Sequence, residues 1–157
     1  SLNNEKGPSA IILSRQKLNY ISKLSGKENK CLKGAYEVNI TAHDHKVILI
    51  ASGSEVSLAL ETQDLLKGVN IESKVVSMPC QELFDQQNEE YKNKILTETK
   101  LVVSVEASET KYWKKYTNKN GLNFGINNFG KSAPYKEIYD NFELNLETIT
   151  KKIKQKL

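Results

Sequence analysis

The chain has 157 residues, of which 38% are hydrophobic and 27% are charged, and 23 basic residues against 19 acids give a formal net charge of +4. This length fits one domain with a short extra segment, and the composition is that of a globular protein. Because the lysines are spread among acids and form no basic stripe interleaved with aromatic residues, the charge does not point to nucleic-acid binding.

The first predicted element is a strand over Ser9–Ser14, which leads directly into Arg15, the only arginine of the chain. An arginine that follows a strand can offer its planar guanidinium to a phosphate group through two hydrogen bonds. An ion pair with an acid of a neighbouring segment explains the same residue equally well. Residues 17–32 are polar and lysine-rich, with no sustained period, and are interpreted as a linker.

From residue 33 onward, apolar runs typical of strands alternate with stripes of helical period. The predicted strands are Gly34–Asn39, Lys46–Ser52, Glu72–Pro79, Lys100–Glu106 and a short one within Asn123–Gly130. The predicted helices run from Val56 to Gly68, over Gln81–Leu96 with a break near Asn88, around Tyr112–Tyr116, after Pro134, and from Asn145. This alternation predicts an α/β fold with three layers, α/β/α, around a mostly parallel sheet of about five strands.

The turn after the second of these strands, "IASGSEV", joins a strand, a glycine and a helix start, the arrangement that can bind phosphate on free backbone amides. Only Gly53 is present, however, so the glycine-rich phosphate motifs are missing. Ser52 and Glu55 have the spacing of a capping box, which would satisfy the same amides internally. We expect structural capping at Gly53-Ser54-Glu55 and keep ligand binding as the alternative.

The stretch "VEASETKYW" places Glu106 and Glu109 near the carboxyl end of a strand, where open α/β sheets bind ligands. Two carboxylates could carry out acid–base chemistry. Acids that begin a helix explain them without any chemistry. Trp113 is interpreted as a core or interface anchor.

The cysteines and histidines indicate no metal site. Cys31 and Cys80 lie far apart without CxxC spacing, which suggests a reducing compartment, and each is interpreted as a small packing residue in preference to a catalytic thiol. His43 and His45 flank Asp44 in an alternating polar stretch that predicts an exposed turn, and a metal site formed by the two histidines with Asp44 is the alternative, which lacks a further histidine to complete it. No apolar run approaches 18 residues and no signal-peptide pattern opens the chain, so we expect a soluble, cytoplasmic protein.

Six stretches taken together resemble the C-terminal part of transketolases, in order and in approximate spacing. They are "GPSAIILSRQKL", "KGAYEV", "VILIASGSEVSLALE", "KVVSMPCQELFDQQNEEYK", "VSVEAS" and "FGKSAPYKEIYDNFELNLETI". The resemblance covers nearly the whole chain. Related thiamine enzymes share the fold but typically lack "LSRQ" with "SMP…FD.Q…Y", and a dihydroxyacetone synthase is the relative hardest to separate.

This resemblance implies a homodimeric enzyme that uses thiamine diphosphate and a divalent cation, Mg or Ca, to move a two-carbon ketol unit from a ketose phosphate to an aldose phosphate. In that family the catalytic, cofactor and metal-binding residues lie in the preceding domains, so none is expected here and the chain alone should be inactive. The arginine of "SRQ" helps to hold the substrate phosphate in transketolases, which implies that role for Arg15.

The resemblance also implies a division of the chain. Residues 1–16 would be the last strand of a preceding pyrimidine-binding domain, residues 17–32 a linker, and residues 33–157 the transketolase C-terminal domain. A stand-alone α/β module that binds a ligand or a protein is the alternative.

Overall fold

The structure is a computed structural model that describes residues 7–14, 17–18, 21, 29–97 and 100–157. Its strands are β1 (Tyr36–Ile40), β2 (Val47–Ala51), β3 (Ser73–Ser77), β4 (Leu101–Val105) and β5 (Leu122–Phe124). Its α-helices are α1 (Glu55–Lys67), α2 (Gln81–Asp85), α3 (Glu89–Ile95), α4 (Lys114–Thr117), α5 (Tyr135–Asn141) and α6 (Leu146–Lys156), joined by the short 3-10 helices η2 (Lys30–Lys33) and η3 (Thr110–Tyr112).

The five strands form one mixed sheet in the order β1-β3-β2-β4-β5. The pairs β2–β3, β2–β4 and β4–β5 are parallel, whereas β1 pairs antiparallel with β3 at the edge. All residues of β2 and β3 are buried, as expected for strands covered on both faces. The predicted α/β fold with a mostly parallel sheet is therefore confirmed.

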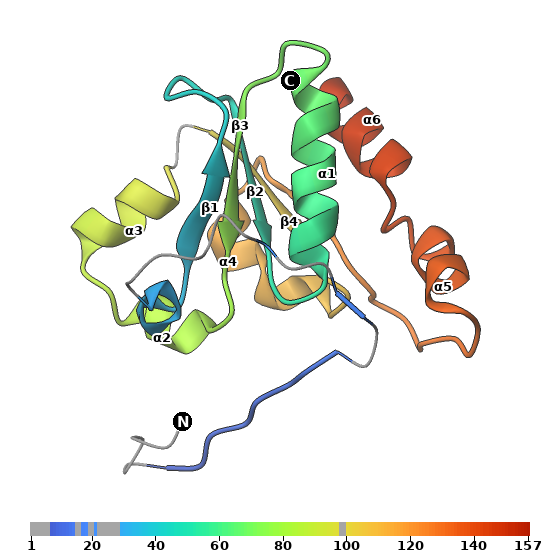
Figure 1. Ribbon diagram of the computed structural model, residues 1–157, viewed down its shortest axis with the longest axis horizontal. Coiled ribbons are helices and arrows are strands. Elements are labelled where there is room, and N and C mark those ends of the chain that lie inside the picture. Colours follow the sequence, from blue (N-terminus) through green and yellow to red (C-terminus); the bar gives the residue numbers. More distant parts are fainter. Residues whose placement is uncertain (1–6, 15–16, 19–20, 22–28, 98–99) are drawn as a thin grey trace.

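Helices cover the sheet on both sides, which makes the three predicted layers (Figure 1). On one face, Leu49 and Val103 pack with Ala59 and Leu66 of α1 and with Ile153 of α6. On the other face, the alternate side chains of the same strands pack in a second core. That core contains Ile48, Ile50, Val76 and Val102 from the strands and Phe84, Ile95 and Trp113 from the helical segments.

Local features of the sequence explain where some of the predicted helices begin and end. The break near Asn88 separates α2 from α3, because the Asn88 side chain accepts a hydrogen bond from the Tyr91 amide and begins the second helix. In α6, Ile149 and Ile153 are buried, whereas Leu157 directly after the helix is 55% exposed. Trp113 is a core residue, 5% exposed.

The predicted strand Ser9–Ser14 is not a strand in this structure. The segment 8–14 has no regular secondary structure, and it extends away from the sheet in Figure 1. Ile11, Ile12 and Leu13 are 69%, 94% and 81% exposed, and no strand or helix of the described ranges covers them. Among the helices of the described ranges, none is long and apolar enough to cross a membrane.

Candidate functional site

Two polar residues lie side by side where the central strands of the sheet end. Ser52 follows β2 and Glu106 follows β4, and these parallel strands are neighbours. The chain passes from β2 to β3 on one side and later returns to place β4 on the other side. The carboxyl ends of β2 and β4 therefore mark the topological switch point, where open α/β sheets usually bind ligands.

The Glu106 carboxylate fills the position that an anionic ligand would take at this switch point. Its Oε2 accepts hydrogen bonds from the Ser52 backbone N–H at 3.0 Å and from the Ser52 hydroxyl at 2.9 Å. The predicted capping box is therefore wrong, since the Ser52 side chain turns across the sheet edge to Glu106. Helix α1 has Ser54 as its N-cap residue, with no hydrogen bond from a capping side chain. The Ser52 amide thus has a partner within the chain, but that partner is distant in the sequence.

The carboxylate partner of Glu106 is Glu55 of α1, and not Glu109. Glu109 precedes η3 and forms an ion pair with Lys111 at 2.7 Å, with its side chain 44% exposed. Glu55 is only 3% exposed, and its negative charge is, after burial, a cause of the raised pKa of Glu106. The sequence could not reveal this pair, because 51 residues separate the two acids and only the pairing of β2 with β4 brings them together.

Hydroxyl groups complete the surroundings of this carboxyl pair. Oε1 of Glu55 accepts hydrogen bonds from the Ser54 hydroxyl at 2.9 Å and from the Tyr139 hydroxyl of α5. Burial, with the hydrogen bond to Glu55 in second place, raises the pKa of Tyr139 above its ordinary value. Tyr139 therefore stays protonated and remains a donor to Glu55 at neutral pH.

The electrostatics of the pair favour a bound proton. Burial, followed by the negative charge of Glu55, raises the pKa of Glu106 to about 7, against the lowering effect of the hydrogen bonds from Ser52. Within the described ranges, no lysine or histidine forms an ion pair with either carboxyl group. The pair can therefore hold or release one proton near neutral pH.

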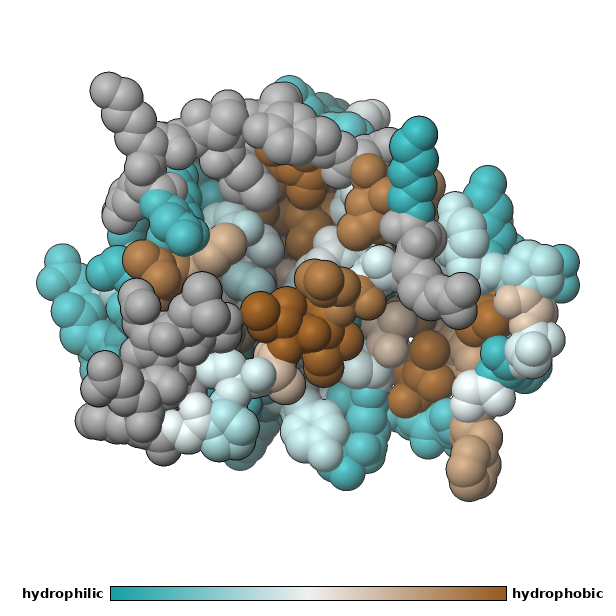
Figure 2. Space-filling model, turned by 60° about the horizontal axis from the view of Figure 1, so that its bottom comes forward, coloured by the Kyte–Doolittle hydropathy of each residue, from teal (hydrophilic) through white to brown (hydrophobic). Residues whose placement is uncertain are grey.

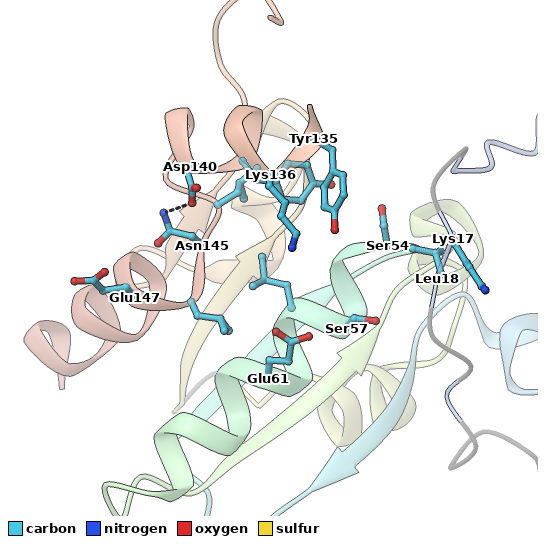
Figure 3. A pocket seen from close by; sticks show the side chains of 14 residues that line it. Lys17, Leu18, Ser54, Ser57, Glu61, Tyr135, Lys136, Asp140, Asn145 and Glu147 are labelled. Carbon is cyan, nitrogen blue, oxygen red and sulfur yellow. Dashed lines mark hydrogen bonds between the residues drawn. The ribbon is translucent and has the colours of Figure 1, made fainter. Parts of the chain in front are cut away.

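A cleft of about 530 Å³ adjoins the pair, between α1, α5 and the start of α6. Figure 3 shows Ser54, Ser57 and Glu61 of α1 facing Tyr135 and Lys136 of α5 across this space. Tyr139 forms part of its wall and joins the cleft to the carboxyl pair. The cleft is lined by acids, lysines and apolar side chains together, so its chemistry does not single out one class of ligand.

The arginine expected to bind phosphate, Arg15, lies outside the described residues. The residue before it, Ser14, donates a hydrogen bond from its hydroxyl to the Ser54 hydroxyl at 3.3 Å. Lys17, two residues further on, lines the cleft. The Ser14 contact thus places the end of the N-terminal segment beside the first turn of α1.

The predictions for histidines and cysteines hold only in part. His43 and Asp44 lie in an exposed turn as predicted, but His45 is only 6% exposed, two residues before the buried strand β2. Its Nδ1 lies 3.1 Å from the Ala42 carbonyl oxygen, and burial lowers the pKa of this imidazole. Cys31 is exposed, which contradicts a packing role, whereas Cys80 is partly buried and both are free thiols. No metal-binding group of three or more acids, histidines or cysteines occurs in the described part of the chain.

Comparison with known proteins identifies related sequences along nearly the whole chain. A family model described as the transketolase-like TK C-terminal domain matches residues 34–145. The chain is 40% identical over 159 residues to a transketolase of Aquifex aeolicus, covering 99% of this chain and 23% of that protein. It is 34% identical to transketolase 1 of Escherichia coli, covering 98% of this chain and 23% of that protein. The chain thus spans about a quarter of the length of these relatives.

Solved structures agree with the sequence relatives. A transketolase from Leishmania mexicana is 40% identical, with a TM-score of 0.71, and the match covers 77% of this chain and 17% of that one. A Pichia stipitis transketolase in complex with sedoheptulose-7-phosphate is 37% identical, with a TM-score of 0.74. This match covers 81% of the present chain and 18% of the Pichia stipitis chain. The fold described above therefore corresponds to a part of much longer proteins.

Proposed function

The chain belongs to the family of transketolase C-terminal domains, and from this premise we propose that it is the C-terminal region of an enzyme that transfers two-carbon ketol units from a ketose phosphate to an aldose phosphate in the pentose phosphate pathway. The observation that carries the proposal is the match of nearly the whole chain to about a quarter of several transketolases. The parent enzyme would use thiamine diphosphate with Mg or Ca, and would work as a cytoplasmic homodimer.

The described residues do not fit the cofactor, which supports placing its site elsewhere in the parent enzyme. The Ser52 amide, the group at the switch point best placed to bind a diphosphate, donates instead to Glu106. A buried Glu55 beside it would repel an anion. When bound in the parent enzyme, thiamine diphosphate would stabilise a carbanion during the transfer. We therefore assign no residue of this chain to that chemistry.

The contribution of this chain would be to bind the substrate phosphate and to support the assembly. Arg15 would hold the phosphate group of the sugar, since its guanidinium can donate two hydrogen bonds to phosphate oxygens. Residues 1–16 would complete the preceding pyrimidine-binding domain, residues 17–32 would be the linker, and residues 33–157 would be the C-terminal domain. The bare apolar side chains of Ile11, Ile12 and Leu13 support the first of these assignments, because an isolated strand leaves its apolar side chains uncovered.

An assay of the parent protein beside this chain tests the proposal. With thiamine diphosphate, magnesium and pentose phosphates, the full-length parent should transfer a two-carbon unit, and the 157-residue chain alone should show no turnover. Product formation is followed by coupled oxidation of a nicotinamide cofactor. If the full-length parent shows no transfer activity, the proposed function is wrong. If the short chain alone shows turnover, the proposal that catalysis requires the preceding domains is contradicted.

A further inference from the structure

The turn between α4 and β5 contains a chemically reactive dipeptide, Asn120-Gly121, and Asn120 is the only asparagine of the chain that a glycine follows. Asparagine is among the thermolabile residues of proteins, because the backbone nitrogen of the following residue can attack its side-chain carbonyl carbon. Glycine hinders this attack least, since it has no Cβ and its backbone is the most permissive. The dipeptide therefore makes Asn120 a candidate for self-modification.

The structure leaves both reacting groups of this dipeptide free. Residues 118–120 form an exposed turn, in which the Asn118 side chain accepts a hydrogen bond from the backbone N–H of Asn120 at 3.0 Å. Among the described residues, none forms a hydrogen bond with the side-chain amide of Asn120. The N–H of Gly121 likewise has no hydrogen-bond partner within the described ranges. Neither group has to leave a partner before the two can react.

Two asparagines further along the chain are held differently. Oδ1 of Asn123 accepts hydrogen bonds from the hydroxyl groups of Ser104 at 2.8 Å and of Thr117 at 3.0 Å. Oδ1 of Asn127 accepts hydrogen bonds from the Thr110 amide at 3.1 Å and from the hydroxyl of the same residue at 2.8 Å. In both cases the carbonyl group would have to give up these bonds before the next backbone nitrogen could attack it.

Packing explains why the second residue of the dipeptide is a glycine. A Cβ atom at Gly121 would lie 1.9 Å from the carbonyl oxygen of Thr117 and 2.6 Å from that of Val102. Both oxygens belong to the backbone, one in α4 and the other in β4, so neither can rotate away. Any other residue would force α4 away from the sheet. The fold therefore requires at 121 the residue that makes Asn120 reactive.

We propose that Asn120 is a site of spontaneous covalent modification, which converts it to aspartate or isoaspartate, and that the isoaspartate form weakens the attachment of β5. In the first step the Gly121 nitrogen loses its proton and bonds to Cγ of Asn120, and the side-chain nitrogen leaves as ammonia. In the second step a water molecule hydrolyses the cyclic imide, at one carbonyl to give aspartate and at the other to give isoaspartate. Asparagine and water are thus converted to an acid and ammonia, with no transfer of electrons.

The isoaspartate product changes the backbone directly before β5. Its main chain runs through the side-chain methylene, which adds a carbon atom ahead of Gly121. The next residue, Leu122, begins β5 and is paired with Val103 of β4. Because Gly121 packs closely against α4 and β4, the longer turn cannot be absorbed on that side without displacing β5. This strand has three residues and lies at the edge of the sheet, so few hydrogen bonds resist its displacement.

Ageing of the complete 157-residue chain in mildly alkaline buffer tests the modification. Trypsin releases residues 120–131 as one peptide, because lysines stand at 119 and 131. Tandem mass spectrometry should show that Asn120 gains the mass difference between an amide and an acid, whereas Asn123, Asn127 and Asn128 of the same peptide keep their amides. Methylation by a protein isoaspartyl methyltransferase should label this peptide. If Asn120 reacts no faster than the exposed Asn128, the proposal is wrong.

Substitutions assign the reaction to Asn120. Asn120→Gln keeps an amide but places it one methylene farther from the backbone, so that attack requires a larger ring that forms slowly. This variant should show neither the mass change at 120 nor the methyl label. Asn128→Gln, in the same peptide, is the matched control and should keep the original rate at Asn120. A methyl label that persists in Asn120→Gln would contradict the assignment.

Hydrogen exchange separates the longer backbone from the added charge. In the isoaspartate fraction, isolated by chromatography, the protected amides of β5 should exchange about tenfold faster than in the fresh chain. Asn120→Asp carries the same charge on an unchanged backbone and should keep the protection of the fresh chain. Equal protection of β5 in the isoaspartate fraction and in the fresh chain would overturn the proposed weakening. None of these measurements requires a sugar or cofactor, so their outcome is independent of the transketolase assay.

Discussion

Single side chains at the switch point bind to one another where a ligand would bind in many related architectures. The Ser52 amide donates to Glu106, and the negative charge of Glu55 contributes to the raised pKa of Glu106. Ser54, the N-cap residue of α1, contacts Glu55 on one side and Ser14 on the other. A line of hydrogen bonds thus runs from Glu55 to the residue that precedes Arg15.

At the scale of one residue, Arg15→Ala in the full-length parent should raise KM for phosphorylated sugars by about 10- to 100-fold, because a charge-assisted contact contributes about 1.5–3 kcal/mol. Values of kcat/KM for unphosphorylated sugars should stay within about twofold. Steady-state kinetics with matched pairs of substrates measure both quantities.

Two controls accompany this substitution. Arg15→Lys keeps the charge but loses the planar pair of donors, and should fall between the parent and the alanine variant. Lys17→Ala removes an exposed cation two residues away and should change little. An equal loss on both classes of substrate would contradict a phosphate contact at Arg15.

Helices α3 and α6 begin at capping asparagine side chains. The Asn145 side chain accepts a hydrogen bond from the Thr148 amide at 2.9 Å and begins α6. Ile149 and Ile153 then pack that helix on the core shared with α1. Helix α5 has neither such a cap nor buried residues, and the partly buried Tyr139 and Phe142 pack against the core from α5 and its C-terminal end.

At the scale of an element, Asn145→Ala should lower the free energy of unfolding by about 1 kcal/mol, because the Thr148 amide loses its partner. Asn145→Ser can restore the cap and should recover most of that loss. Urea unfolding followed by circular dichroism gives both values. Equal losses in the two variants would show that the cap of α6 is not the source of the effect.

In the molecule as a whole, helices cover both faces of the sheet, whereas the N-terminal segment 8–14 is exposed. Figure 2 shows apolar side chains gathered on the face that carries the carboxyl edge of the sheet. Ile11, Ile12 and Leu13 are exposed within that segment, whereas the strands β2 and β3 of the sheet are fully buried. This contrast is expected for a segment whose sheet belongs to another part of the parent protein.

At the scale of the molecule, Ile12→Lys should leave the stability of this chain within about 0.5 kcal/mol, because the side chain is 94% exposed here. In the full-length parent the same substitution should cost at least about 2 kcal/mol, because the residue would lie in the sheet of the preceding domain.

Thermal and denaturant unfolding of both proteins check the difference. Val69→Lys adds the same charge at a partly exposed apolar residue between α1 and β3, and serves as the control. Equal effects of Ile12→Lys in the short chain and in the parent would contradict the proposed domain division.

Local patterns in the sequence were sufficient for most of the fold. The apolar run before Ser52, the break near Asn88 and the helix start at Asn145 each predicted an element that the structure contains, because each depends on neighbours in the chain. The same local reasoning failed at His45, a buried residue two positions before β2 among polar neighbours.

The sequence by itself determined the α/β class, the order of the elements and the family resemblance, since these follow from periodicity and motif order. Only the tertiary structure decided that the Ser52 side chain donates a hydrogen bond to Glu106 and does not cap α1. It also decided that Glu55 is the acid next to Glu106. Both contacts cross from one strand end to another over about 50 residues of sequence, and they form because β2 and β4 are neighbours in the sheet. Partial burial of Glu106 beside the negative charge of Glu55, which no local pattern records, is what raises the pKa of Glu106 to about 7.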